Sequence, residues 1–430
     1  MKLHGLKTLV VGMEKSGRAS AEFLRAHSAD VTTTDIKPLD VPGFRLQSDA
    51  LLAEPWDLIV LSPGVPADLE PLRQARARSV NVIGEIELAA DFLKGNVIGI
   101  TGSNGKTTTT SLTGHILLSA GVSSQVGGNI GTPVIAMTDT SHDDRWNVLE
   151  LSSFQLETAR TFRADIAVCL NVTQNHLDRH RTMQSYIDAK ANLFRMQLPG
   201  SHAVLNAGDK TCRSFSEITL AKTAWFSRDD IRKGHIWLGE DPLMPLAEIP
   251  IPGPHNAENV MAAAHVARLA GVPLEKIAAA VRTFKAVEHR LEFTRSVAGV
   301  RYYNDSKATS VDAAMKAIDS FEGNLWVILG GTDKGSDYTL MREKLRDKAR
   351  AVLLIGAAAE KIGADLEGAV PLIPCGTLQQ AVSEAYNSAR PGDTVLLAPA
   401  CSSFDQFQNY EQRGQIFKQL VKDLKNGAAA

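Results

Sequence analysis

The sequence has little of what marks disulfide-bonded, membrane or nucleic-acid-binding proteins. Its four cysteines, Cys169, Cys212, Cys375 and Cys401, form no CxxC pair, which favours free thiols in a reducing compartment over disulfides or a zinc site. No apolar run approaches the roughly 18 residues of a membrane helix, and the run from Leu9 to Val11 is too short for a signal-peptide core. The formal net charge is only −2. We therefore expect a cytoplasmic protein that binds neither membranes nor nucleic acid.

The chain has 430 residues, which is longer than a single hydrophobic core usually grows. Short β-branched runs, each followed by an Ala/Leu-rich helical stretch, recur along its whole length. Alternating strands and helices predict parallel sheets, so the expected fold class is α/β. We expect three domains, at residues 1–93, 94–288 and 289–430.

A glycine-rich stretch follows the predicted strand from Val97 to Thr101. It reads Gly102, Ser103, Asn104, Gly105, Lys106, Thr107 and Thr108. The glycines let backbone N–H groups surround phosphate oxygens, Lys106 neutralises phosphate charge, and the Thr107 hydroxyl suits Mg²⁺. The spacing is a shorter variant of G-x-x-x-x-G-K-[ST]. We interpret the stretch as an ATP site rather than as a turn that only caps a helix.

Polar segments follow the next two strands. Glu150 closes one strand, and His176 follows the strand from Ile166 to Asn171. The carboxyl ends of parallel strands meet at one edge of a sheet, where a carboxylate and an imidazole can hold a divalent metal. A helix cap and a core histidine remain open as alternatives, and His176 can also position a substrate. Lys190, in a helical segment, is by composition a solvated surface residue.

The last third of the chain has polar strand ends that suit an anionic substrate. Asn304 to Ser310, Gly330 to Gly335 and Ala398 to Phe407 each end a predicted strand with lysines or hydroxyls. Three such ends in one sheet indicate a second substrate pocket. Pro254 to Asn259 either caps the helix that it precedes or covers a nucleotide base. Arg290 either contacts phosphate or makes a surface ion pair.

Together these motifs resemble the Mur ligase family, over nearly the whole chain. The resemblance implies a Rossmann-like N-terminal domain that binds a UDP-sugar, a central P-loop ATPase-like domain with a mostly parallel sheet, and a Rossmann-like C-terminal domain that binds an amino acid. Asn304 to Thr309 and Ser402 to Phe407 resemble the segments of the member that adds D-glutamate. The implied reaction is ATP-dependent ligation of D-glutamate to UDP-N-acetylmuramoyl-L-alanine through an acyl phosphate, in peptidoglycan precursor synthesis, by a monomer.

The resemblance also implies roles for single residues. Lys106, His176 and Lys190 are implied to be catalytic. The loop from Gly102 to Thr108 is implied to bind ATP together with Asn256, Asn259, Arg290 and Asp305. Two Mg²⁺ ions, which Mn²⁺ can replace, are implied to be held by Thr107, Glu150, His176 and Lys190, the lysine carrying a CO₂-derived carbamate. D-Glutamate is implied to contact Lys307, Thr309, Lys334, Ser403 and Tyr410.

The first loop departs from the pattern of relatives. Gly12 to Gly17 puts Glu14 where a G-x-G-x-x-G turn has its second glycine. That glycine lets a backbone approach a dinucleotide pyrophosphate, so Glu14 argues against NAD. The candidate UDP-sugar residues are Ser16, Asp35, Lys37, Gly64, Asn129 and His176.

Three other functions remain open from the sequence. Another amino-acid ligase of this superfamily, such as a folylpolyglutamate synthase, shares the phosphate loop. A non-catalytic regulator would use ATP only to close its domains, and would release no ADP with saturating substrates. An oxidoreductase is disfavoured both by Glu14 and by the phosphate loop.

Overall fold

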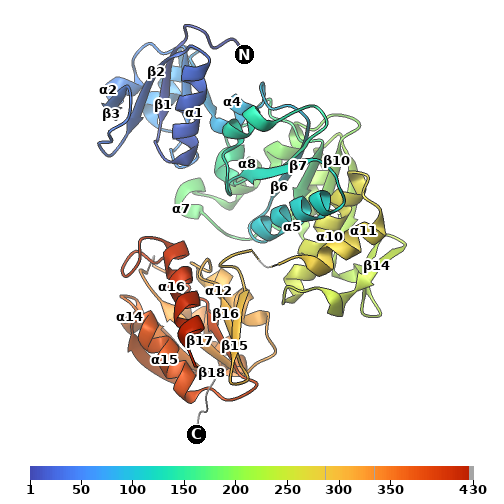
Figure 1. Ribbon diagram of the computed structural model, residues 1–430. Coiled ribbons are helices and arrows are strands. Elements are labelled where there is room, and N and C mark those ends of the chain that lie inside the picture. The colour runs from blue at the N-terminus through green and yellow to red at the C-terminus, as the bar shows by residue number, and fades with distance from the viewer. Residues whose placement is uncertain (286, 334, 426–430) are drawn as a thin grey trace. The chain divides into compact units, whose positions relative to one another are not determined.

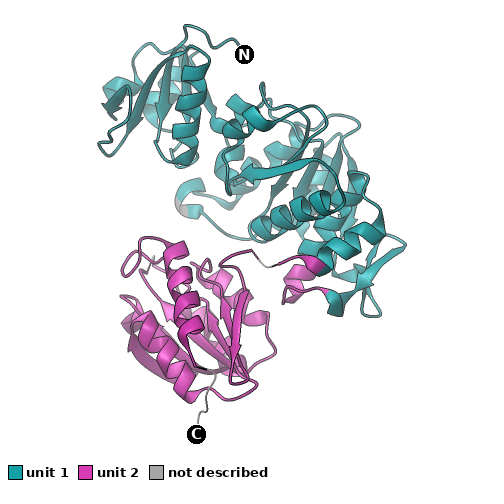
Figure 2. Cartoon of the chain, viewed as in Figure 1, with its two compact units in different colours: residues 1–248, 258–282 teal, residues 249–257, 283–430 magenta. Residues whose placement is uncertain are grey.

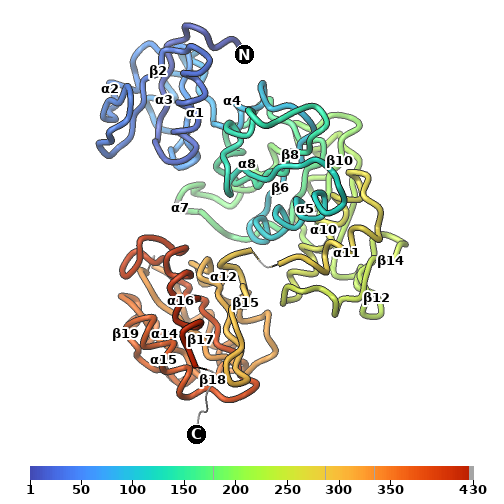
Figure 3. The backbone as a smooth tube through the Cα atoms, in the orientation of Figure 1, coloured from blue at the N-terminus to red at the C-terminus, as the bar shows by residue number. Residues whose placement is uncertain are grey.

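The computed structural model describes residues 1–285, 287–333 and 335–425 (Figure 1). They form two compact units, shown in different colours in Figure 2. Unit 1 comprises Met1–Glu248 and Glu258–Arg282, and unit 2 comprises Ile249–Ala257 and Thr283–Ala430. Helices and strands follow one another along most of the chain (Figure 3) and the large sheets are mostly parallel, so the predicted α/β class is confirmed. The division into three domains stays a prediction.

The first sheet of unit 1 has the strand order β3-β2-β1-β4-β5 and is wholly parallel. Its central strands β1 and β4 are short, largely apolar runs buried on both faces, as helix-covered parallel sheets require. The strands are β1 (Lys7–Val11), β2 (Asp30–Asp35), β3 (Phe44–Leu46), β4 (Leu58–Leu61) and β5 (Asn81–Gly84). The helices are α1 (Lys15–Ala26), α2 (Asp49–Leu52), α3 (Glu70–Ala77) and α4 (Glu85–Ala89).

The second sheet of unit 1 is also parallel, in the order β11-β10-β9-β6-β8-β7. Its strands are β6 (Asn96–Thr101), β7 (Ser124–Gly128), β8 (Trp146–Glu150), β9 (Ile166–Cys169), β10 (His202–Asn206) and β11 (Lys222–Phe226). Its helices are α5 (Lys106–Ser119), α6 (Ser153–Leu156), α7 (Leu177–His180), α8 (Met183–Arg195) and α9 (Lys210–Ser214), with 3₁₀ turns η1 (Val134–Thr140) and η2 (Phe215–Glu217).

A small antiparallel sheet follows, in the order β12-β13-β14. It comprises β12 (Ile231–Arg232), β13 (His235–Leu238) and β14 (Asp241–Pro245), flanked by η3 (Arg228–Asp230) and η4 (Leu246–Glu248). Helices α10 (Pro254–Leu269) and α11 (Leu274–Thr283) come next. The segment from Pro254 to Asn259 therefore lies inside α10, and the prediction that it precedes the helix was wrong. Proline is well tolerated in the first helical turn, whose N–H groups lack intrahelical partners.

One buried apolar cluster joins the two large sheets of unit 1. It includes Val10 and Leu24 from the first sheet and its helix, Leu88 from α4, and Leu149 and Ala167 from the second sheet. Burial of this shared surface holds the first 90 residues against the central sheet. None of the described helices is long and apolar enough to cross a bilayer.

Unit 2 is built on a six-stranded sheet in the order β15-β16-β20-β17-β18-β19. Only β15 runs antiparallel to its neighbour. The strands are β15 (Glu292–Val297), β16 (Val300–Asn304), β17 (Leu325–Gly330), β18 (Ala349–Ile355), β19 (Leu372–Gly376) and β20 (Thr394–Leu397). The helices are α12 (Val311–Asp319), η5 (Tyr338–Met341), α13 (Arg342–Lys348), α14 (Ala359–Leu366), α15 (Leu378–Ser388) and α16 (Tyr410–Asp423). Apolar clusters cover both faces of this sheet.

Candidate functional site

The predicted phosphate loop is a tight turn between β6 and α5. Its first and last residues, Gly102 and Gly105, have φ angles of 147° and 84°, which glycine adopts without a Cβ clash. A Cβ on Gly105 would lie 2.3 Å from Oδ1 of Asn259 in α10. The loop opens into the first turn of α5, which contains Lys106, Thr107 and Thr108. The N–H groups at the start of a helix point along its axis, toward the loop, and are suited to bind phosphate.

The Lys106 ammonium lies over this loop. Its Nζ donates hydrogen bonds to the carbonyl oxygens of Gly102 and Ser103, at 2.9 and 3.0 Å. The loop is also tied to the segment after β9, because Ser103 Oγ donates to the Thr173 carbonyl at 2.9 Å and the Asn104 N–H donates to Asn171 Oδ1 at 2.9 Å. A positive charge is thus held beside a backbone cradle of fixed shape, an arrangement that can bind a polyphosphate.

Thr107 and Glu150 meet beneath the loop. Residue pairing between β6 and β8 places Ile100 opposite Glu150, so the carboxylate emerges at the sheet edge where the loop begins. Thr107 Oγ1 donates to Glu150 Oε2 at 2.7 Å, and Asn129 Nδ2 donates to Glu150 Oε1 at 2.9 Å. Glu150 is 2% exposed. Thr107, Asn129 and Glu150 thus meet at this edge, which offers oxygen atoms of the kind that Mg²⁺ binds.

Lys190 is buried in α8, so its interpretation as a solvated surface residue was wrong. It is 1% exposed, because this face of α8 packs on the central sheet beside β6. Its Nζ donates to the Gly102 carbonyl at 3.0 Å and to Thr101 Oγ1 at 3.3 Å, and lies 4.5 Å from the centre of the Tyr186 ring. Burial, together with the nearby Lys106 charge, lowers the pKa of Lys190 to about 7. A large fraction of this amine is therefore neutral near pH 7.

His176 lies at the N-cap of α7 and is exposed. Its ring contacts the edge of Phe154 at 5.0 Å between centroids and lies 6.5 Å from the Tyr186 ring. His176 and Lys190 thus share Tyr186 as a neighbour. Within the described residues, no three His, Cys, Asp or Glu side chains gather into a metal-binding group. Mg²⁺ bound beside a nucleotide takes several of its ligands from water and phosphate.

A cavity of about 770 Å³ lies between the first sheet and the end of β7. This volume suits a ligand of nucleotide-sugar size. Four of the predicted UDP-sugar residues line it, namely Ser16, Asp35, Gly64 and Asn129; Lys37 and His176 are not among its described lining residues. Sequence reasoning missed Gln47, Ser62 and Gln155, which also line it. Ser62 directly follows β4, so its position at a strand end was the available signal.

Glu14 lies in the loop between β1 and α1. Glu14 is the N-cap residue of α1 and lines the cavity. The Met13 N–H donates to Asp35 Oδ2 at 2.8 Å, which fixes the carboxylate at the end of β2. A Cβ on Gly17 would lie 1.8 Å from the Gly12 carbonyl oxygen, so this position needs glycine for close packing of α1 on β1.

Asn256 and Asn259 are both buried in α10. Asn259 Oδ1 accepts a hydrogen bond from Thr109 Oγ1 of α5 at 3.2 Å, which places it against the phosphate loop. Asn256 Nδ2 instead donates to the Pro252 carbonyl at 2.6 Å.

In unit 2, Asp305 follows β16 and is buried, 8% exposed. Burial raises the pKa of Asp305 to about 6, and the Arg290 charge and a hydrogen bond from the Leu291 N–H oppose that rise. Arg290 and Asp305, both predicted ATP-site residues, are therefore electrostatic neighbours. Lys307 Nζ lies 5.4 Å from the centre of the Tyr410 ring, which brings two predicted D-glutamate residues together.

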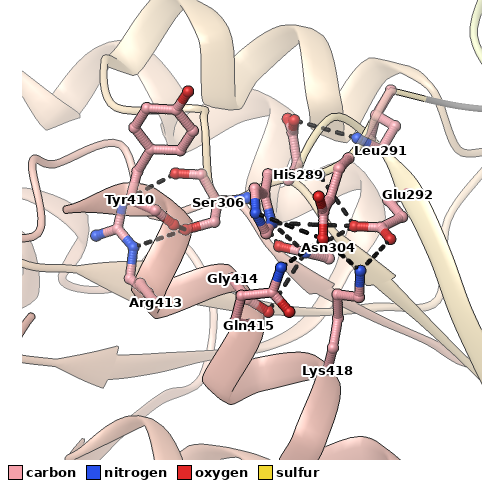
Figure 4. A network of polar contacts seen from close by, with 12 residues as sticks. His289, Leu291, Glu292, Asn304, Ser306, Tyr410, Arg413, Gly414, Gln415 and Lys418 are labelled. Carbon is pink, nitrogen blue, oxygen red and sulfur yellow. Dashed lines mark hydrogen bonds and ion pairs between the residues drawn. The ribbon is translucent and has the colours of Figure 1, made fainter. Parts of the chain in front are cut away.

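Arg413 of α16 binds the segments that follow β16 and β20. Sequence reasoning did not predict this residue. It is fully buried, with Nε donating to Ser306 Oγ at 3.0 Å and Nη2 donating to the Ser306 carbonyl at 2.9 Å (Figure 4). Its Nη2 also donates to the Cys401 carbonyl at 3.2 Å. Ser403 is buried and Thr309 is partly exposed. Lys334, the remaining predicted D-glutamate residue, lies outside the described residues.

A second set of contacts joins α16 to the start of β15 and, through it, to the end of β16 (Figure 4). Asn304 Nδ2 lies 2.9 Å from His289 Nδ1 and donates to Glu292 Oε2 at 3.0 Å. Lys418 bridges Glu292 and Glu288 at 2.6 and 2.9 Å. These contacts fix the strand end that carries Asp305 and Lys307.

Two family models match the chain. Residues 100–267 match the Mur ligase middle domain, and residues 289–401 match the domain described as Mur ligase, glutamate ligase domain.

Curated proteins of similar sequence cover the chain from end to end. The UDP-N-acetylmuramoylalanine–D-glutamate ligase of Solibacter usitatus is 60% identical over 440 residues, 99% of each chain. The enzyme of the same name from Acidobacterium capsulatum is 51% identical over all of this chain and 99% of its own.

Solved structures of low sequence identity share the fold. The UDP-N-acetylmuramate–alanine ligase of Thermotoga maritima has a TM-score of 0.64 at 18% identity, covering 98% of this chain and all of its own. A MurF ligase from the same organism, solved with ADP, has a TM-score of 0.64 at 16% identity, covering 98% of this chain and 96% of its own.

Proposed function

The chain belongs to the Mur ligase family, and we propose that it joins D-glutamate to UDP-N-acetylmuramoyl-L-alanine with the conversion of ATP to ADP and phosphate, a step of peptidoglycan precursor synthesis. The observation that carries this proposal is the 60% identity to a D-glutamate ligase over 99% of both chains. We further propose that the protein acts in the cytoplasm as a monomer.

In the first step, a carboxylate oxygen of the L-alanyl group attacks the γ-phosphorus of ATP, and the bond from that phosphorus to the ADP oxygen breaks. The product is an acyl phosphate, whose carbonyl carbon accepts an amine where a free carboxylate does not. Lys106 and the N–H groups of the loop from Gly102 to Thr108 neutralise the charge that spreads over the transferred phosphoryl group. Phosphoryl transfer depends mainly on such positioning and electrostatics.

In the second step, the D-glutamate amine attacks the acyl carbon, the bond from that carbon to the phosphate oxygen breaks, and the amine loses a proton. Lys307, Thr309, Ser403 and Tyr410, with Lys334, are the residues proposed to hold D-glutamate. The Lys307 ammonium and the buried Arg413 charge lie at neighbouring strand ends and favour a dianionic amino acid. His176 is proposed to orient the reacting groups.

The residues around the loop fit divalent cations. Thr107 Oγ1 and Glu150 Oε2 already lie 2.7 Å apart and are hard oxygen donors. They would hold one Mg²⁺, while His176 and a carbamylated Lys190 would hold a second; Mn²⁺ can take either place. When bound, such ions withdraw charge from phosphate oxygens. ATP itself is proposed to contact Asn256, Asn259, Arg290 and Asp305 in addition to the loop.

The buried position of Lys190 supports the proposed carbamylation. The neutral amine attacks the carbon of CO₂ and releases a proton, leaving an anionic carbamate in place of a cation. A charged lysine beside Lys106 is disfavoured by burial and by like-charge repulsion, and a carbamate replaces that repulsion with attraction to the Lys106 charge.

The 770 Å³ cavity is the proposed site of the UDP-sugar. Asn129 lines the cavity and also donates to Glu150, so one side chain links the nucleotide-sugar end to the phosphate loop.

The test is ADP release with UDP-N-acetylmuramoyl-L-alanine while the added amino acid is varied. We expect D-glutamate to support the reaction and L-glutamate, L-alanine and diaminopimelate to fail. Preference for another amino acid would overturn the proposed acceptor. ADP release with a pteroylglutamate in place of the nucleotide sugar would favour a folylpolyglutamate synthase, and no ADP with any acceptor would favour a regulator.

A further inference from the structure

Arg179 of α7 reaches the loop that lines the UDP-sugar cavity. Its Nη1 donates to the Gly64 carbonyl at 3.0 Å and its Nη2 donates to the Val65 carbonyl at 2.6 Å. Both of these loop residues line the 770 Å³ cavity. The Arg179 side chain is 16% exposed. A planar guanidinium that engages two adjacent carbonyls fixes the direction as well as the distance of its partner.

The same arginine contacts Phe154, whose ring packs against His176. The Arg179 guanidinium lies 5.1 Å from the centre of Phe154, and Glu157 accepts from Nη2 at 3.4 Å. Phe154 in turn contacts His176 edge-on at 5.0 Å and stacks on His180 at 5.2 Å. A continuous series of packed groups therefore runs from the cavity loop through Arg179 and Phe154 to His176.

The turn that carries His176 depends on such contacts for its position. Helix α7 has only four residues, and the residues at its two ends, His176 and Arg181, have φ angles of 55° and 64°. Left-handed conformations of residues other than glycine are costly and persist where the surroundings impose them. Withdrawing the Arg179 bridge would leave α7 free to relax.

We propose that Arg179 is a positioning residue that couples the nucleotide-sugar cavity to His176, so that a ligand in the cavity and Mg-nucleotide at the phosphate loop strengthen each other's binding. This inference rests on the proposed function, because it takes the UDP-sugar as the occupant of the cavity. A ligand that orders the Gly64–Val65 loop holds the two carbonyls in place for Arg179. The arginine then holds α7 in the orientation that presents His176. Such coupling is reciprocal, so Mg-nucleotide must strengthen binding in the cavity by the same factor.

Calorimetry on the full chain tests the proposal. The dissociation constant of UDP-N-acetylmuramoyl-L-alanine is measured with and without saturating MgADP, for the wild type and three variants. We expect MgADP to tighten wild-type binding about fivefold or more. In Arg179→Met the ratio should fall to near one. Arg179→Lys keeps the charge but not the two-pronged contact, and should lose most of the coupling.

Arg181→Met is the matched control. Arg181 follows α7 directly and, like Arg179, contacts the N-terminal part of unit 1, through an ion pair with Asp68 at 2.7 Å. Its side chain, however, is 77% exposed. Exposed ion pairs contribute little, so this variant should keep the wild-type ratio. Thermal unfolding of each variant separates loss of coupling from loss of folding, and Arg179→Lys remains informative if the methionine variant does not fold.

Two outcomes overturn the inference alone: wild type that binds both ligands without mutual strengthening, or Arg179 variants that keep the full ratio. A protein that binds MgADP but not the nucleotide sugar overturns the proposed function at its UDP-sugar end, and this inference with it.

Discussion

Thr107 Oγ1 and Glu150 Oε2 are 2.7 Å apart although the residues are 43 positions apart in the chain. The contact exists because β6 and β8 are parallel neighbours whose carboxyl ends meet at one edge. It brings a hydroxyl from the phosphate loop and a buried carboxylate to a single point. The proposed metal chemistry depends on this pair.

Thr107→Val should abolish most activity, because it removes the hydroxyl and keeps the shape. We expect kcat to fall on the order of 100-fold and the Mg²⁺ concentration for half-maximal rate to rise. The control is Thr110→Val on the same helix: the Thr110 hydroxyl is buried, and no hydrogen-bond partner of it lies within the described part of the chain. Unchanged Mg²⁺ dependence in Thr107→Val would contradict the assignment of this pair to the metal.

Gly105→Ala should weaken nucleotide binding through a steric effect. The new Cβ would lie 2.3 Å from Asn259 Oδ1, so either the loop or α10 must move. We expect the dissociation constant of MgADP to rise on the order of 10-fold or more.

Gly121→Ala is the control for that substitution. Gly121 has φ of 83°, almost equal to the 84° of Gly105, but a Cβ on Gly121 would have nothing within 4 Å of it. This variant should lose only about 1 kcal/mol of unfolding free energy from backbone strain and keep its MgADP affinity. Equal affinities in the two variants would show that crowding at Asn259 is irrelevant.

Lys190→Ala should lower kcat by at least about 100-fold, since the proposed carbamate is a metal ligand and even outer groups at metal sites matter by 10–100-fold. Added acetate should restore part of the rate by supplying a carboxylate. With ¹³C-labelled bicarbonate, wild type should show a carbamate carbon signal that the variant lacks. Full activity of Lys190→Ala would rule out the carbamate.

Glu85→Gln should change how stability depends on pH. Glu85 is 1% exposed and accepts a hydrogen bond from the Ile135 N–H at 2.7 Å. Burial raises the pKa of Glu85 to about 7, although hydrogen bonds from the N–H groups of Ile135 and Val134 act to lower that pKa. Between about pH 4 and 7 the folded protein keeps a proton that the unfolded chain has lost. Wild-type unfolding free energy therefore falls as pH rises through this window.

The glutamine variant lacks that dependence. Its stability relative to wild type should grow from near zero at pH 4 to as much as about 3 kcal/mol at pH 8. Urea unfolding at both pH values measures the difference. A constant difference between pH 4 and pH 8 would mean that Glu85 titrates normally.

Parallel-strand reasoning predicted the loop, Glu150 and the polar strand ends of unit 2, because such ends are local in sequence and their edge follows from the topology. Groups contributed by helices were not predictable in this way. Tyr186 contacts Ser103 across 83 residues, and Arg179 contacts Gly64 across 115. Neither motif spacing nor composition indicates which face of α7 or α8 meets the loop.

Lys190 and Arg413 show a related limit. Lysine and arginine are seldom fully buried, so composition favours an exposed position for both. Their burial follows from tertiary packing around the loop and around the strand ends of unit 2. A family resemblance singled out Lys190, whereas nothing in the local sequence singled out Arg413.

The most direct test of the central claim is to identify the product. The purified protein is incubated with ATP, Mg²⁺, UDP-N-acetylmuramoyl-L-alanine and D-glutamate, and nucleotide-sugar products are followed by mass spectrometry alongside ADP. We predict a product heavier by one glutamyl residue, formed in equal amount to ADP. ADP without this product, or the same product from L-glutamate at an equal rate, would contradict the account.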